Sequence, residues 1–458
     1  MAKVVARETK TKNIKFYFLK ILKPIFVLPP VYRIINIITI FQINKKSKNN
    51  KKNILCVGDP DDRMKFLEIE SENFDINFIW FPRRVVDWLF KKYIKVNKIV
   101  GLGEWSLDQY YDNKIVNQKR RKKMRHMYFV LLKDVKKLFK IECLLLPKLN
   151  DDWIVDFQLA ANKLRIPIVV NDRESAISPQ RMAVYPSMLK KYSDHLNVAN
   201  YICVNNDMHF EFFAKSGIKK DKIKLTGSPQ SDVWKIQTTS KPLNNLVNKL
   251  DKNKKTILYL GFGVRSYLNF YYEGENRTWD DLCKEVHNEL GKFIIDNKDD
   301  VNILYKIGSK AARDYWHGYD EFYAELVNNN AQNSIIQVRD KILTPELLPF
   351  IDLTISFQTT GVVEAMFHDA PIIYVGWGDL YKDIKHTLHD FENSGILTAS
   401  NKEEFRNLLN LYSQDNLPDM NRENFDKWKY DFFFKADGKA SYRILNYVLK
   451  AIEEGSTN

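Results

Sequence analysis

The chain has 458 residues, of which 45% are hydrophobic and 13% aromatic. This length exceeds one ordinary core and predicts two domains plus an appendage, and the apolar content excludes wholesale disorder. The four cysteines, Cys56, Cys143, Cys203 and Cys283, form no CxxC pair. The pattern therefore indicates neither a zinc knuckle nor a disulfide framework, and it favours a reducing, cytoplasmic compartment.

The net charge of +14 is concentrated at the amino terminus. Residues 1–52 contain 13 Lys and Arg against the single acid Glu8, which leaves about +2 for the rest of the chain. An apolar run from 16 to 41 is interrupted by Lys20, Lys23, Arg33 and three prolines, which disfavour a transmembrane span. We predict a basic amphipathic arm that binds an anionic membrane surface; the alternative is packing on the protein itself. No nucleic-acid partner is predicted, because these cations lie beside apolar residues rather than with stacking aromatics.

Residues 53–240 read as an α/β domain, with strands expected at 53–58, 75–81, 142–149, 166–170 and 200–205 and a further candidate at 98–102. A basic run at 119–125 precedes a helix predicted over 127–139. We interpret the run as a solvated helix start, with a second contact to a membrane or an anionic glycan as the alternative.

The strand at 166–170 brings Asp172, Arg173 and Glu174 to the edge of the sheet at which open α/β folds bind ligands and carry catalytic residues. The alternative there is an ion pair that stabilises a turn. Turn-forming residues at 227–232 predict a loop.

A polar, lysine-rich segment at 241–255 is interpreted as a linker to a second α/β domain at 256–435. Its first strand, predicted at 256–260, runs into Gly261, Gly263 and Arg265. A lone GxG is weak evidence for phosphate binding, but the arginine and the place after a first strand strengthen it. Further strands are predicted at 301–307, which contains Lys306, and at 334–338, 353–356 and 371–375.

The stretch from 353 to 375 predicts a right-handed βαβ unit. Its first strand ends at a turn of Gln358, Thr359, Thr360 and Gly361, which opens a helix that carries Glu364. Small residues at a helix start favour a bound phosphate, because backbone N–H groups and the helix dipole point there.

Three segments carry a family resemblance: the TGSP-type loop at 226–229 with Asp232, the turn between Ser356 and Met366, and the ending at 437–444. Together they resemble the GT-B glycosyltransferases of bacterial surface-polysaccharide biosynthesis. Among these, the closest are enzymes related to CDP-glycerol glycerophosphotransferases, Kdo transferases and nonhydrolysing UDP-GlcNAc 2-epimerases. The resemblance covers about residues 53–450 and implies two Rossmann-like domains facing a cleft, with a closing helix at 436–458.

The resemblance also implies site roles. Gln358, Thr359, Thr360 and Gly361 would bind the donor's phosphates, and Glu364 would accept hydrogen bonds from ribose hydroxyls. Two features of the family are missing. The Lys-Pro-His-Pro of many Kdo and sialyl transferases is absent after 305–308, and the position eight before Glu364 is Ser356 rather than a glutamate.

The predicted function is transfer of a sugar, or of glycerophosphate, from a nucleotide-activated donor to a membrane-linked surface-polysaccharide acceptor, on the inner face of the plasma membrane. Asp172 and Glu174 are the candidate bases of a predicted inverting reaction, with Asp59, Asp61 and Asp62 in reserve. Gly261, Gly263, Arg265 and Lys306 would complete the donor site, with no metal and no cofactor beyond the nucleotide-activated co-substrate. Two alternatives remain: a UDP-sugar 2-epimerase-like isomerase, and a noncatalytic membrane-bound assembly partner.

Overall fold

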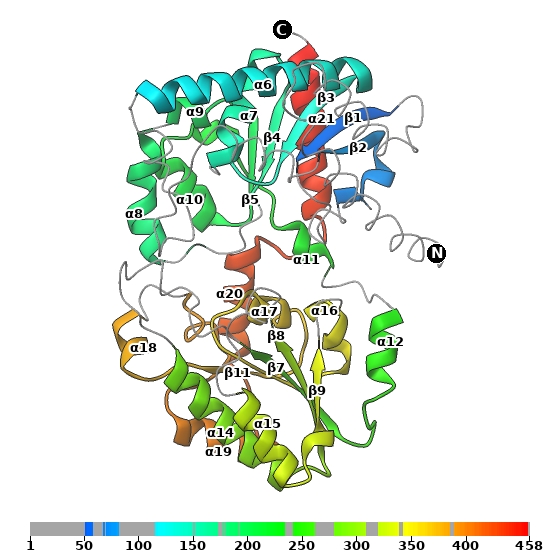
Figure 1. Ribbon diagram of the computed structural model, residues 1–458, viewed down its shortest axis with the longest axis vertical. Helices are drawn as coiled ribbons and strands as arrows, with labels where there is room; N and C mark the ends of the chain where they lie inside the picture. The colour runs from blue at the N-terminus through cyan, green and yellow to red at the C-terminus, as the bar shows by residue number, and fades with distance from the viewer. Residues whose placement is uncertain are drawn as a thin grey trace.

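The computed structural model contains two α/β halves, each built on a parallel six-stranded sheet (Figure 1). It describes residues 51–57, 67–68, 70–81, 115–149, 152–172, 177, 179–191, 193–233, 241–261, 279–307, 319–338, 342–384 and 389–456. The predicted arm up to residue 50 and the candidate strand at 98–102 lie outside these ranges. None of the helices that the structure describes combines the length and apolar character of a membrane span.

The first half holds a sheet with the strand order β2-β1-β3-β4-β5-β6. Its strands are β1 (Lys52–Val57), β2 (Ile76–Phe81), β3 (Ile141–Leu146), β4 (Ile168–Asn171), β5 (Tyr201–Val204) and β6 (Ile223–Leu225). The helices are α6 (Ile115–Phe139), α7 (Asp152–Lys163), α8 (Pro179–Lys190), α9 (Ser193–Leu196), α10 (Asp207–Lys215) and α11 (Pro229–Val233), with short 3-10 turns at Ser71–Asn73 and Lys220–Lys222. Such strands are buried on both faces, which explains their continuous apolar sequences.

The second half repeats the plan with the strand order β12-β11-β10-β7-β8-β9. Its strands are β7 (Lys255–Gly261), β8 (Val301–Ile307), β9 (Ile335–Val338), β10 (Leu353–Ser356), β11 (Ile372–Val375) and β12 (Leu397–Ala399). The helices are α12 (Lys241–Val247), α14 (Asp280–Asp296), α15 (Tyr319–Asn328), α16 (Thr344–Leu347), α17 (Thr360–Ala365), α18 (Asp379–Ile384) and α19 (Lys402–Ser413), with 3-10 turns at Gln332–Ser334 and Leu348–Phe350.

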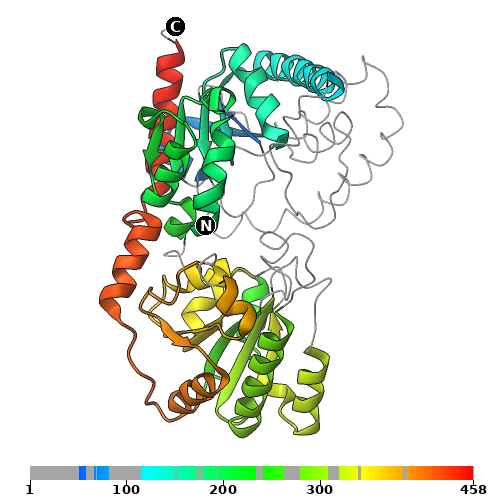
Figure 2. The ribbon, with the colours of Figure 1, turned by 90° about the vertical axis from the view of Figure 1, so that its left-hand side faces the viewer.

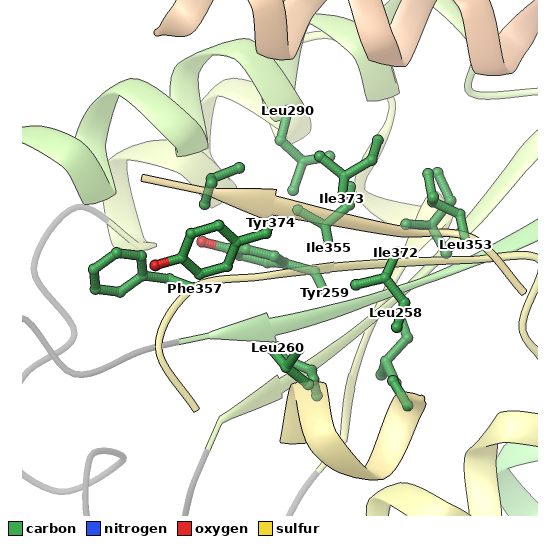
Figure 3. Close-up of a cluster of buried hydrophobic side chains, with 14 of the residues drawn as sticks. Leu258, Tyr259, Leu260, Leu290, Leu353, Ile355, Phe357, Ile372, Ile373 and Tyr374 are labelled. Atoms are coloured by element: carbon green, nitrogen blue, oxygen red, sulfur yellow. The ribbon is translucent and has the colours of Figure 1, made fainter. Parts of the chain in front are cut away.

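The core of the second half lies on both faces of β7, β10 and β11. Ile355 and Ile373 extend from neighbouring strands toward Leu290 of α14, whereas Leu260 lies on the opposite face beside a helix (Figure 3). Because side chains alternate across a strand, the two faces receive successive residues of the same apolar run. This packing fixes the register that brings the strand ends together.

The chain then returns to the first half. Helix α20 (Arg422–Phe433) lies at the side of the molecule between the two halves, and α21 (Ala440–Ser456) runs along the first sheet (Figure 2). Ile444, Leu445 and Val448 of α21 are buried in one cluster with residues of β1, β3 and β4. The first half is therefore completed by the last helix of the chain.

The two-domain α/β fold expected from the sequence is confirmed, with differences in three elements. The basic run at 119–125 lies inside α6 instead of preceding a helix, because good helix formers continue the turn without a break. The predicted loop at 227–232 contains α11, which Pro229 starts. The segment 241–255 holds α12, and its Leu243 and Leu246 belong to the core of the second half.

Candidate functional site

The carboxyl ends of three neighbouring strands converge in the second half. Ser356 of β10 pairs with Leu260 of β7, and Gly261 of β7 pairs with Ile307 of β8. The register therefore places Gly261, the turn that follows β10 and the end of β8 at one edge of the sheet. This is the edge at which open α/β folds bind ligands.

The turn after β10 packs closely on β7. Thr359 caps α17, and its side-chain oxygen accepts a hydrogen bond of 3.3 Å from the Gly361 N–H. A Cβ at position 361 would lie 2.7 Å from Cδ1 of Leu260. A side chain at position 361 would force the Leu260 side chain to shift, so glycine permits the close approach of helix and strand. The backbone of the predicted phosphate turn lies directly against the first strand of its domain.

Gln358 is buried and hydrogen bonded within the protein. Its Nε2 donates to the Tyr374 hydroxyl at 2.7 Å and to the His389 carbonyl at 2.9 Å, and its Oε1 accepts from the His389 N–H at 3.2 Å. The side chain therefore holds the segment that contains His389 over the ends of β10 and β11. A direct contact of this side chain with a donor, as predicted from the resemblance, remains a prediction.

His389 lies where the two halves approach each other. Burial and, to a smaller extent, the nearby charge of Arg181 on α8 of the first half together lower its pKa to about 4. The imidazole is therefore neutral at pH 7. Next to it, Tyr374 lies 3.5 Å from the Tyr381 hydroxyl, which in turn donates to Glu392. Burial raises the pKa of Tyr374, so this hydroxyl stays protonated.

The other predicted donor residues have varied settings. Glu364 lies in the second turn of α17 and is partly exposed. Lys306, near the end of β8, donates a hydrogen bond of 2.6 Å to the Ile342 carbonyl, which holds the segment before α16. Gly263 and Arg265 lie outside the described residues, as does Glu174 of the first half. Their predicted roles are unchanged by the structure.

The first half presents a row of buried polar residues at its own carboxyl edge. Asp172 directly follows β4, is 5% exposed, and donates its backbone N–H to the Cys203 carbonyl at 3.0 Å. Lys148 and Asn205 follow the adjacent strands β3 and β5 and are buried as well. The sequence predicts a single strand over 142–149 and so does not single out Lys148, whereas β3 ends at Leu146. Pro147 is the feature that could have revealed this residue. Proline has no N–H to donate to a neighbouring strand, so it predicts that the strand ends before Lys148.

Two segments of the family resemblance meet between the halves. The Asp232 carboxylate accepts hydrogen bonds from the N–H groups of Ala440 at 3.0 Å and Ser441 at 2.7 Å, at the start of α21. Arg443 donates to the Thr226 carbonyl at 2.7 Å and pairs with Asp437 at 2.9 Å. These contacts join the TGSP-type loop to the DGKA ending, so both segments stabilise the return of the chain to the first half.

The same joint contains unusual backbone. Gly227 has φ +81°, and a Cβ there would lie 3.0 Å from the Phe433 carbonyl oxygen. The first three of the six residues that link α20 to α21, Phe434, Lys435 and Ala436, all have positive φ. Asn206, after β5, donates to the Phe432 carbonyl at 2.7 Å. The joint is thus a tight turn that packs against the ends of β5 and β6.

Within the ranges that the structure describes, no group of three or more His, Cys, Asp or Glu side chains lies close enough to hold a metal ion. The reserve bases Asp59, Asp61 and Asp62 lie outside those ranges.

The sequence matches no known family model and no curated protein. Solved structures are similar in backbone. UDP-GlcNAc 2-epimerase from Neisseria meningitidis bound to UDP-GlcNAc is 12% identical, with 87% of this chain and 100% of that chain covered and a TM-score of 0.54. The UDP-GlcNAc 2-epimerase of Methanocaldococcus jannaschii is 16% identical, with coverage of 86% and 99% and a TM-score of 0.53. The S. aureus MnaA–UDP structure is 14% identical, with coverage of 88% and 97% and a TM-score of 0.50.

At these identities the likeness concerns the backbone alone. It spans both halves and nearly the full length of each neighbour, so the similarity is not confined to one Rossmann-like unit. The chain has a GT-B-like fold of two α/β domains.

Proposed function

We propose that this protein transfers a sugar, or glycerophosphate, from a nucleotide-activated donor to a membrane-linked glycan acceptor. One observation carries the donor part: the Thr359–Gly361 turn, Gly261 and the end of β8 converge at one edge of the second sheet. The fold likeness to proteins solved with UDP-GlcNAc or UDP supports a nucleotide-linked substrate. The donor's diphosphate would lie on the backbone N–H groups of the turn, and Glu364 would bind the ribose.

The first half would supply the acceptor side of the reaction. Asp172 or Glu174 would take the proton of the acceptor hydroxyl as its oxygen attacks the donor. Arg265 and Lys306 would offset the charge that develops on the departing nucleotide phosphate. Lys148, beside Asp172 at the neighbouring strand end, adds a cation to this edge. We propose a metal-independent, inverting reaction at the inner face of the plasma membrane.

The second candidate is a UDP-sugar 2-epimerase-like isomerase. The structural neighbours favour it, since several are UDP-GlcNAc 2-epimerases that share the whole two-domain fold. The basic arm favours transfer, because an enzyme whose substrates are all soluble needs no membrane contact. The two candidates share the donor site and differ in the fate of the sugar.

The donor site is tested by calorimetry with UDP, CDP, GDP and CMP on the full chain. We expect one nucleotide diphosphate or monophosphate to bind, and Glu364→Ala to weaken it severalfold. Glu453→Ala, which changes an exposed glutamate of α21, is the matched control. Equal affinity of the Glu364→Ala variant would remove the ribose role, and no binding of any nucleotide would refute the donor site.

The reaction is tested separately with the matching nucleotide sugar. Proton NMR of the sugar reports inversion at C2 in the absence of acceptor, and release of free nucleotide only with lipid-linked glycan reports transfer. C2 inversion without acceptor would establish the isomerase and refute transfer. Nucleotide release that depends on the acceptor would do the reverse.

A further inference from the structure

Helix α6 carries a row of lysines along its outward side. Its buried side consists of Met124, Tyr128, Leu131, Leu132 and Val135, which pack in the core of the first half. With 3.6 residues per turn, the opposite side receives five exposed lysines, which we call the basic stripe: Lys119, Lys122, Lys123, Lys133 and Lys137. At a rise of about 1.5 Å per residue, the stripe is roughly 27 Å long.

The stripe is unfavourable for the helix itself. Helix α6 contains nine Lys and Arg and a single acid, Asp134. Lys119 with Lys123 and Lys133 with Lys137 are like charges at i,i+4, which repel each other. There is no acid in the first turn, and cations near a helix amino terminus oppose its dipole. A face selected only for solubility would mix the two signs, so the single sign points to an anionic partner.

Other cations of α6 have roles in the fold. Arg125 pairs with the buried Asp156 at 2.6 Å, and Lys136 donates to the Leu164 carbonyl at 2.9 Å. These contacts lie on the flanks of the helix, toward α7. They hold α6 on the domain without involving the outward stripe.

The stripe ends beside the point where the basic arm joins the domain. Asn53, at the start of β1, donates a hydrogen bond of 2.7 Å to the carbonyl of Phe139, the last residue of α6. The arm of residues 1–52 carries 13 cations and an apolar run, and it enters the domain at this place. Near the same end, Leu138 is 55% exposed. The last residue of α6 and the start of β1, to which the arm is joined in the sequence, are thus adjacent.

We propose that the basic stripe of α6 binds the headgroups of an anionic lipid bilayer, together with the arm. A flat charged surface suits a straight row of lysines, and the apolar run of the arm suits the acyl boundary. Nucleic acid fits less well, because Phe129, the ring beside the stripe, is half-buried with Lys163 Nζ 5.1 Å from its centroid. This inference deepens the membrane part of the proposed function and is independent of its nucleotide part.

The stripe orients the molecule. In both views α6 lies at the end of the first half that is remote from the second half (Figures 1 and 2). A bilayer bound by the stripe would therefore lie at the end of the first half that is remote from the donor half, whereas Asp172 lies at the carboxyl edge of the first sheet.

The first experiment measures partition of the full chain onto vesicles of phosphatidylcholine with and without 30% phosphatidylglycerol. A lysine near an anionic surface contributes roughly a fivefold factor in binding. We expect Lys119→Gln, Lys122→Gln, Lys133→Gln and Lys137→Gln together to weaken partition more than tenfold. The control replaces four exposed lysines elsewhere by Gln: Lys249, Lys252, Lys284 and Lys402. Equal loss in both variants would overturn the proposal, because only net charge would then matter.

The second experiment is decisive even if the arm alone holds the protein on the vesicle. All four native cysteines are buried, so a fluorophore can be placed on His126→Cys, within the stripe, or on Lys284→Cys, in the second half. We expect a headgroup-attached quencher to quench the label at 126 strongly and the label at 284 weakly. Equal quenching of the two labels would refute the orientation. Tighter binding of an oligonucleotide than of vesicles, weakened by the stripe variant, would assign the surface to nucleic acid instead.

Discussion

Replacing Gln358 by methionine should loosen the candidate site without changing its shape. Methionine has nearly the same length and volume as glutamine, but it cannot make the three hydrogen bonds to Tyr374 and to the backbone of His389. Each such bond contributes about 1 kcal/mol net, and buried partners left unpaired raise the cost. The better burial of an apolar side chain offsets part of this. We therefore expect the free energy of opening the segment that begins at His389 to fall by about 3 kcal/mol.

Hydrogen exchange followed by mass spectrometry measures the opening of this segment directly. A local measurement is needed because the global unfolding of a two-domain protein need not be two-state. A loss of about 3 kcal/mol corresponds to exchange roughly 100-fold faster in residues 389–399. Gln414→Met, at an exposed glutamine after α19, is the matched control and should leave exchange in this segment unchanged. If Gln358→Met left the protection of 389–399 within twofold of the parent, Gln358 would not hold the segment and the reasoning from its hydrogen bonds would fail.

Three further predictions follow from single residues. Burial lowers the pKa of His287 to about 4, below its unfolded value near 6.5, so the unfolded state binds more protons between these values. The free energy of unfolding should therefore fall by about 3 kcal/mol as pH drops from 6.5 to 4, and urea titrations of His287→Leu should show that much less pH dependence. Asp232→Ala removes both acceptors at the start of α21 and should lower stability by about 2 kcal/mol, whereas the exposed Asp419→Ala should not; equal melting temperatures would exclude a stabilising joint. Asp172→Asn and Glu174→Gln should, one or the other, abolish turnover and spare nucleotide affinity, and full activity in both would move the base elsewhere.

Much of the fold could be predicted because parallel strands buried on both faces leave a simple signal. The apolar runs that became β4, β5, β7 and β8 are bounded by polar residues or glycine, so their positions were clear within one or two residues. The basic run of α6 was harder to place, since a charged helix start and a charged loop look alike without an acid to cap it. The helix α11 was read as a loop because its residues are turn formers, and it is held by tertiary contacts to α21.

The sequence predicts where the candidate site lies, but not which hydrogen bonds and contacts its residues make. That Thr359 and Gly361 follow a buried strand is visible in the sequence, whereas the contact of Gly361 with Leu260 depends on the pairing of β10 with β7. The resemblance suggested a ligand role for Gln358, and the structure shows that its side chain bonds to a segment 31 residues away. Asp232 and Arg443 illustrate the same limit, because they act on partners more than 200 positions distant.

The charge distribution separates the two candidate reactions more sharply than the donor site does. A glycosyltransferase with a lipid-linked acceptor needs its acceptor-binding domain near the bilayer. The basic stripe lies on the first half, which is the proposed acceptor half, and the arm precedes that half in the sequence. An isomerase acting on a soluble nucleotide sugar gains nothing from that arrangement, yet the like charges of α6 would still destabilise its helix. The transferase predicts that the stripe binds anionic lipid. It also predicts that replacing the stripe lysines lowers turnover on a membrane-embedded acceptor while nucleotide affinity is unchanged. Unchanged turnover of the stripe variant on that acceptor would show that membrane binding by the stripe is not needed for transfer, whereas C2 inversion without any acceptor would establish the isomerase.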